Sequence, residues 1–130
     1  MTGSFSPEEC FTDERFDADA VRWACAFARH LEVERGLSSN TVRAYCIDIR
    51  SYLDWAARSD LDPLQVEYRR FRRYLVELNA AGSTPKTTSR RLSAIRTFFK
   101  YLNVQGVTQL NPAAATSSPK SGRDLPRKTS

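Results

Sequence analysis

The sequence lacks any apolar run of the roughly 18 to 20 residues that a membrane-spanning helix needs. Its opening is acidic, with Glu8, Glu9 and Asp13, and lacks the basic and then apolar order of a secretory signal peptide. These absences favour a cytoplasmic protein with no membrane partner. The 130 residues, 41% of them hydrophobic, fit one domain with an ordinary core and exclude two large domains.

Histidine, cysteine and glycine are also scarce. The three cysteines, Cys10, Cys25 and Cys46, are an odd number without paired spacing, so we expect reduced thiols rather than a disulfide framework. The single histidine, His30, leaves too few ligands for a usual zinc site and offers little as a general base. The five glycines fall at ends and turns, and no pattern marks any acid as buried for acid–base work. The sequence therefore predicts no metal, no cofactor and no catalysis by this chain.

The two halves of the chain differ in charge. Residues 1–68 hold 7 basic and 13 acidic side chains, a net charge of −6, whereas residues 69–130 hold 13 basic and 2 acidic ones, a net charge of +11. Nine cations stand against Glu77 alone between residues 69 and 100: Arg69, Arg70, Arg72, Arg73, Lys86, Arg90, Arg91, Arg96 and Lys100. Such a cluster favours binding to the phosphates of a nucleic acid, with a solvated helix surface as the alternative.

Apolar residues recur at steps of three and four, the spacing of amphipathic helices, in four segments. The helices are expected from Asp17 to Arg35, from a cap at Ser38 or Ser39 through Ala56, from Pro63 to before Gly82, and from a cap at Ser83 or Thr84 to before Gly106. No segment alternates apolar and polar residues as a half-buried strand does. The sequence therefore predicts an all-α domain, orthogonal or bundle-like, over residues 16–110.

The two ends lack such periodicity. Residues 1–15 mix glycine, serine, proline and acids, and we expect them to form a flexible leader. Residues 111–130 are rich in proline, alanine and serine and are expected to form a linker. The cations of this linker suit a path beside an acidic partner, although they serve equally well to keep a tail soluble.

Two helical faces suit a duplex. In the fourth expected helix, Lys86, Arg90 and Ser93 lie on a stripe directed away from the core, and an α-helix fits the major groove of DNA. The second expected helix presents Asn40 and Arg43 in the same way, although a simple exposed face explains this stripe equally well.

Aromatic residues interleave with these cations, as in proteins that stack single-stranded bases. Core packing is the favoured role for Phe98 and Phe99, which lie on or beside the apolar stripe, and leaves at most Tyr101 for such contacts. Trp23 and Trp55 are likewise expected to be structural.

Several motifs together resemble the amino-terminal core-binding domain of Xer-type tyrosine recombinases and phage integrases, over residues 27–126. The resemblance rests on L-E-V-E-R-G-L-S-S-N-T-V-R-A-Y at residues 31–45 and S-R-R-L-S-A-I-R-T-F-F-K-Y-L at residues 89–102. It is supported by N-P at residues 111–112 and by P-K and L-P within residues 119–126.

This resemblance implies a compact SAM-like bundle of four main helices that forms half of a C-shaped clamp on double-stranded DNA. The second and fourth helices face the DNA in that family. By position in the motifs, and with Ser93 added from the stripe above, the DNA-binding residues are expected to be Asn40, Thr41, Arg43, Lys86, Thr87, Arg90, Arg91, Ser93 and Arg96. The helical wheel places Arg91 beside the core.

The resemblance also implies a nucleoid-associated parent that cleaves and exchanges DNA strands through a phosphotyrosine link, as a tetramer with other recombinase protomers. Motifs for the family's catalytic residues are absent, so we expect the catalytic domain to be missing from this chain. Chromosome-dimer resolution and integration of a mobile element both remain possible roles. A helical adaptor for a protein partner and a self-sufficient nuclease are the two alternative classes.

Overall fold

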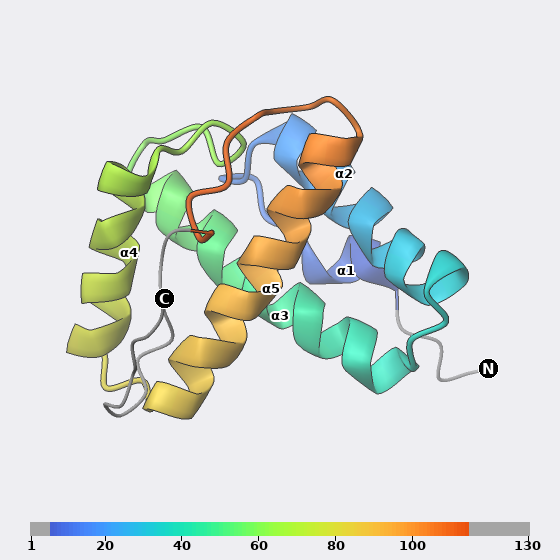
Figure 1. Ribbon diagram of the computed structural model, residues 1–130, viewed down its shortest axis with the longest axis horizontal. Helices are drawn as coiled ribbons and strands as arrows, with labels where there is room; N and C mark the ends of the chain where they lie inside the picture. Colours follow the sequence, from blue (N-terminus) through green and yellow to red (C-terminus); the bar gives the residue numbers. More distant parts are fainter. Residues whose placement is uncertain (1–5, 115–130) are drawn as a thin grey trace, which may run out of the picture.

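The computed structural model describes residues 6–114, which fold into helices joined by turns (Figure 1). The elements are α1 (Pro7–Cys10), α2 (Ala18–Arg29), the π-helical turn η1 (His30–Glu34), α3 (Ser39–Arg58), α4 (Tyr68–Ala80) and α5 (Pro85–Val104). No strand occurs within residues 6–114. The all-α prediction is confirmed.

Local sequence signals set the ends of most helices. The Asp17 carboxylate caps α2 by accepting a hydrogen bond from the backbone N–H of Ala20 at 3.0 Å. The helix continues through η1 and ends at Gly36, whose φ of 65° lies in the left-handed region that favours glycine. The expected helix over residues 17–35 is thus present, with a change from α to π geometry near its end.

The third expected helix begins later than predicted. It starts at Tyr68 rather than Pro63, because residues 61–67 form a turn whose apolar side chains Leu64 and Val66 enter the core. The buried Tyr52 hydroxyl donates a 2.5 Å hydrogen bond to the Pro63 carbonyl and so holds this turn against α3. A spacing of two between Leu64 and Val66 suits such a turn and not a helix.

The expectation of a flexible leader over residues 1–15 is wrong for residues 6–15. Pro7 is buried in α1, and Phe11 is 2% exposed within the main core. The Arg50 guanidinium of α3 donates a 2.7 Å hydrogen bond to the Cys10 carbonyl. Glu8 also pairs with Arg29 of α2. Residues 1–5 lie outside the described part of the chain.

The expected linker also begins too early. Pro112 and Ala113 are buried, and the Arg96 guanidinium donates a hydrogen bond to the Ala113 carbonyl at 3.2 Å. The Asn111 side-chain amide in turn donates to the Arg96 carbonyl at 3.3 Å. Residues 111–114 therefore pack on α5, and residues 115–130 of the predicted linker lie outside the described residues.

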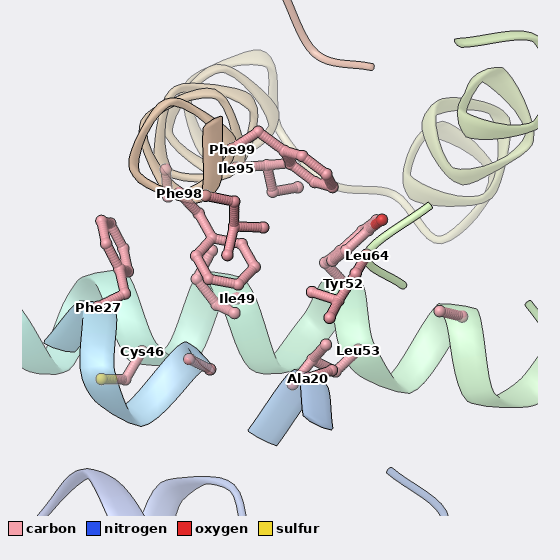
Figure 2. Close-up of a cluster of buried hydrophobic side chains, with 14 of the residues drawn as sticks. Ala20, Phe27, Cys46, Ile49, Tyr52, Leu53, Leu64, Ile95, Phe98 and Phe99 are labelled. Carbon is pink, nitrogen blue, oxygen red and sulfur yellow. The ribbon is translucent and has the colours of Figure 1, made fainter. Parts of the chain in front are cut away.

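The core forms where α5 crosses α3, with α4 on one side of the crossing and α1 and α2 on the other (Figure 1). Tyr52 of α3 contacts Phe99 of α5 edge to face, with ring centroids 6.0 Å apart. Figure 2 shows Ile49 and Leu53 of α3 beside this pair. These side chains are at most 1% exposed, so the crossing is fixed by close packing of large apolar groups.

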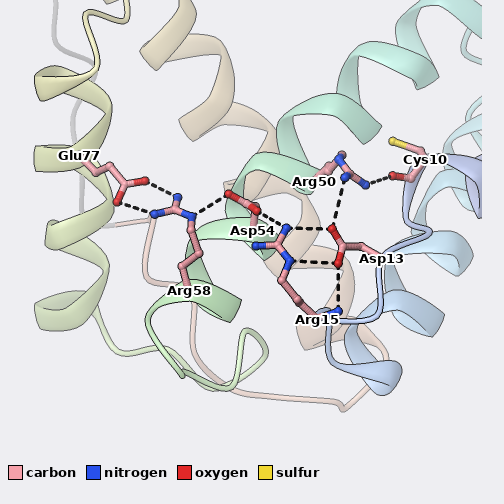
Figure 3. A network of polar contacts seen from close by, with 7 residues as sticks. All are labelled: Cys10, Asp13, Arg15, Arg50, Asp54, Arg58 and Glu77. Carbon is pink, nitrogen blue, oxygen red and sulfur yellow. Dashed lines mark hydrogen bonds and ion pairs between the residues drawn. The ribbon is translucent and has the colours of Figure 1, made fainter.

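A chain of ion pairs ties α3 to α4 and to the amino-terminal segment (Figure 3). Arg58 of α3 binds Glu77 of α4 at 2.5 Å, and Asp54 of α3 accepts a hydrogen bond from Arg15 at 2.7 Å. Bonds from Arg15 lower the pKa of Asp13 to about 2. The carboxylates of Asp13, Asp54 and Glu77 are therefore paired with arginines of the chain itself.

Candidate nucleic-acid interface

The amino-terminal halves of α3 and α5 line a common groove with a cavity volume of about 600 Å³. We call it the α3–α5 groove. Its lining residues are Asn40, Thr41, Ala44, Tyr45, Asp48, Lys86, Ser89, Arg90, Ser93 and Ala94. The two helical stripes that the sequence predicted separately are therefore brought together on one surface.

Both groove helices begin with the same kind of cap. The Ser38 hydroxyl accepts a hydrogen bond from the Thr41 N–H at 3.2 Å, and the Thr84 hydroxyl accepts one from the Thr87 N–H at 3.1 Å. Each capping hydroxyl also donates to the threonine hydroxyl three residues later, at 3.0 and 3.1 Å. Of the alternatives left open by the sequence, Ser38 and Thr84 are the caps. These bonds hold the first turns of both helices, and their positive dipole ends, at the groove.

A two-bonded ion pair joins the helices across the groove. Arg90 of α5 donates from Nε and Nη2 to the two carboxylate oxygens of Asp48 of α3, at 3.0 and 2.9 Å. The Asp48 side chain is 2% exposed, whereas that of Arg90 is 53% exposed. The carboxylate raises the pKa of Arg90, which stays cationic at the surface of the groove.

Arg91 lies outside the groove, on the side of α5 that the helical wheel places beside the core. Its side chain is 22% exposed, and its Nε lies 3.6 Å from an Asp48 oxygen. It also lies near Tyr74 of α4, where burial raises the pKa of the phenol and the Ser51 hydrogen bond and the Arg91 charge oppose the rise. Arg91 therefore belongs to the junction of α3, α4 and α5 and does not line the groove.

Arg96 is also absent from the groove, because its guanidinium is directed at the Ala113 carbonyl. Thr87 is half-buried within the α5 cap, and Arg43 is exposed on α3 one turn beyond Asn40. Neither of these two side chains lines the groove itself. Of the nine residues predicted to bind DNA, the groove unites five: Asn40, Thr41, Lys86, Arg90 and Ser93.

Sequence reasoning missed Asp48 in particular. No acid was expected to be buried, yet Asp48 is 1% exposed. A signal was present, because Asp48 follows Tyr45 by three residues and precedes Tyr52 by four, which places it at the edge of the apolar stripe of α3. Ser89 was missed too, although it follows Lys86 by three residues on the same face of α5.

A second cationic surface lies on α4. Arg69, Arg72 and Arg73 line a shallow hollow together with the exposed Val76. These three guanidiniums form no ion pair within residues 6–114. The residues that line this hollow differ from those of the α3–α5 groove, so the nine clustered cations of the sequence fall on more than one surface.

Phe98, Phe99 and Trp55 belong to the core, as predicted. Phe98 and Phe99 are 0% exposed, and Trp55 is 2% exposed. Tyr101 is half-buried and contacts the rings of Phe27 and His30, with centroids 5.6 and 5.0 Å away. None of these rings lines the α3–α5 groove.

The three cysteines are free thiols. Burial raises the pKa of Cys25, and a hydrogen bond with Cys10 together with burial raises that of Cys46. Within residues 6–114 no group of three histidine, cysteine or acidic side chains is placed to hold a metal ion. In the same range no helix combines the length and apolar character required to span a membrane.

Comparison with known proteins identifies the class. The sequence model described as phage integrase, N-terminal SAM-like domain, matches residues 25–106. The chain belongs to this family. That range includes both groove helices and the Asp48–Arg90 pair.

Named relatives are tyrosine recombinases. The chain is 35% identical over 102 residues to tyrosine recombinase XerC of Xanthomonas campestris pv. campestris. The aligned region covers 78% of this chain and 32% of the relative. The chain is 36% identical over 101 residues to XerC of Thermodesulfovibrio yellowstonii, covering 78% and 33% of the two chains. It is 33% identical over 105 residues to tyrosine recombinase XerD of Caulobacter vibrioides, covering 81% and 34%. The chain thus spans about a third of the length of these relatives. No solved structure gives a significant match.

Proposed function

We propose that this domain binds double-stranded DNA through the α3–α5 groove and serves as the core-binding domain of a site-specific tyrosine recombinase. The observation that carries the proposal is the groove itself, in which the amino-terminal halves of two capped helices place Asn40, Lys86 and Arg90 on one surface. Membership of the integrase SAM-like family supports it.

The chemistry of the lining suits a duplex. Lys86 offers a point charge to phosphate, and the hydroxyls of Thr41 and Ser93 are donors to phosphate oxygens. The positive ends of the two helix dipoles add to this attraction. A helix of about 10 to 12 Å diameter enters a major groove about 12 Å wide, where Asn40 is suited to an adenine edge.

The family further suggests the role of the whole protein. We propose that strand cleavage and exchange belong to a catalytic region that corresponds to the other two thirds of the relatives' length. This domain then contributes DNA contacts and orientation, in an assembly with other recombinase protomers. Its DNA is a recombination site used in chromosome-dimer resolution or in integration of a mobile element.

A salt titration tests the DNA-binding proposal. The 130-residue chain is titrated into a fluorescein-labelled 30-base-pair duplex, and anisotropy is followed from low to moderate salt. Each neutralised phosphate contributes a slope of about −0.9 to log affinity against log salt, so we expect a steep linear fall. An apolar adaptor for a protein partner predicts no duplex binding even at low salt.

Two double variants with the same charge change locate the binding surface. Arg43→Gln with Lys86→Gln alters Lys86, which lines the groove, and Arg43, which is exposed on α3 one turn beyond the groove residue Asn40. Arg69→Gln with Arg72→Gln alters the α4 surface. We expect the first pair to weaken binding at least tenfold and to flatten the salt slope by about 1.8, because two phosphate contacts are lost. The second pair should change affinity less than threefold.

Each contrary result has a defined meaning. Equal losses in both double variants indicate binding to net charge alone and refute the groove. A larger loss in the α4 variant moves the interface to α4. Nicking of supercoiled DNA by the chain supports the nuclease alternative instead.

A further inference from the structure

We propose that Asp48 is a positioning residue for DNA binding, which orients the Arg90 guanidinium so that its remaining N–H donors face a phosphate in the α3–α5 groove. This inference rests on the proposed function. It assigns a DNA-binding role to the one acidic side chain that lines the groove.

The geometry of the pair defines the orientation. Arg90 uses Nε–H and one Nη2–H to bind the two oxygens of Asp48, at 3.0 and 2.9 Å. A guanidinium carries five N–H donors in one plane, so three remain, two on Nη1 and one on Nη2. Because the Arg90 side chain is 53% exposed and lines the groove, these donors are accessible to a ligand there.

Asp48 is itself held firmly. Its side chain is 2% exposed, and the Arg91 Nε lies 3.6 Å from the same oxygen that receives Arg90 Nη2. Two cations therefore surround one carboxylate, and the cluster keeps a net positive charge. Because Asp48 belongs to α3 and Arg90 to α5, the direction of the Arg90 guanidinium depends on how these two helices cross.

Such restraint favours binding because a free arginine must lose rotamer freedom when it contacts a ligand, whereas a restrained one has already lost it. A fixed planar fork also matches two oxygens of one phosphate. Simple charge counting predicts the opposite effect for Asp48, since a carboxylate near DNA repels phosphates. The two accounts therefore differ in the sign of the effect when the charge is removed.

Asp48→Asn separates the accounts in the same duplex titration. Charge counting predicts tighter binding by this variant. Positioning predicts binding three- to tenfold weaker and a salt slope flatter by about 0.9, because asparagine has one acceptor oxygen and its amide donors repel the guanidinium. Circular dichroism and thermal unfolding establish that the variant is folded before it is titrated.

Asp54→Asn is the matched control. It removes the same charge from the same helix, and Asp54 also binds two arginines, Arg15 and Arg58, but it does not line the groove. If acids on α3 have only a structural role, both variants should change the stability of the domain and leave the DNA affinity of the folded chain unchanged. We expect Asp54→Asn to keep the wild-type affinity within twofold and the wild-type salt slope.

A double-mutant cycle tests the coupling directly. In a chain that carries Arg90→Gln, the further change Asp48→Asn should have no additional effect on affinity, because the residue that Asp48 positions is gone. Arg90→Lys gives a second measurement if Asp48→Asn fails to fold. It keeps the charge and loses the fork, so it should bind three- to tenfold more weakly than wild type.

The outcomes distinguish this inference from the proposed function. Folded Asp48→Asn that binds as tightly as wild type, or more tightly, with an unchanged slope overturns the positioning role and leaves DNA binding intact. Unchanged affinity of Arg90→Lys has the same meaning. Absence of salt-dependent duplex binding by the wild-type chain instead overturns the proposed function.

Discussion

The cap of α5 offers a sharp test of how local sequence supports the groove. Thr84→Ala removes the hydroxyl that accepts from the Thr87 N–H at 3.1 Å. Loss of such a cap costs about 1 kcal/mol of the free energy of unfolding. With 109 described residues and an unfolding entropy of about 2.1 cal/mol/K per residue, this loss lowers the melting temperature by about 4 °C.

Thr88→Ala is the matched control for this prediction. It deletes the same atoms four residues later, inside α5, where alanine is favoured over threonine by up to about 0.7 kcal/mol. The two variants should therefore change stability in opposite directions, whereas Thr84→Ser should stay within about 0.5 kcal/mol of wild type. Urea unfolding monitored by fluorescence of the two tryptophans, Trp23 and Trp55, measures all three. Equal destabilisation by the two alanine variants would show that the cap does not act as described.

Three further variants test the core and the ion pairs. Tyr52→Phe leaves the Pro63 carbonyl without its 2.5 Å hydrogen bond and should lower the free energy of unfolding by about 1 to 3 kcal/mol in urea titrations. Phe99→Ala removes a fully buried ring and should cost about 3 to 5 kcal/mol in the same assay. Asp13→Asn removes a carboxylate whose pKa is lowered to about 2 by bonds from Arg15. Because the folded pKa lies below the unfolded value of about 3.9, the stabilisation is present above pH 4 and is lost as the pH falls towards 2. Thermal melts of wild type and variant should therefore differ at pH 6 and converge near pH 2.

Specific results contradict each of these expectations. A Tyr52→Phe chain as stable as wild type shows that water replaces the lost donor. If Phe99→Ala lowers the free energy of unfolding by less than about 1.5 kcal/mol, the crossing of α3 and α5 is not closely packed there. Val76→Ala, at a position 68% exposed, is the control for truncation of a surface side chain. A constant difference between wild type and Asp13→Asn from pH 6 to pH 2 assigns its effect to something other than ionisation.

Much of the site was predictable because it is encoded locally. The period of α5 placed Lys86, Arg90 and Ser93 on one stripe, and the structure retains that stripe. The stripe of α3 was equally readable at Asn40. These assignments depend only on residues within a few turns of one helix, which is the range over which helical periodicity holds.

Contacts between distant segments were not predictable in the same way. Arg90 and Arg96 have the same chemistry and lie on the same helix, yet one pairs with Asp48 at the groove and the other binds the Ala113 carbonyl. The helical period places the two arginines on different faces of α5, but nothing in the local sequence identifies the partner of either one. Likewise, Phe11 stands among acids and lacks apolar neighbours at helical spacing, so its place in the core was hidden.

The sequence by itself determined the helical class, the start of α2 near Asp17, the caps of α3 and α5 to within one residue, and the cationic face of α5, since each depends on near neighbours along the chain. Only the tertiary structure decided that Asp48 is buried and that its carboxylate orients the guanidinium of a residue 42 positions away. The physical reason is that burial and ion pairing depend on which helices cross, and crossing is settled by the packing of the whole core.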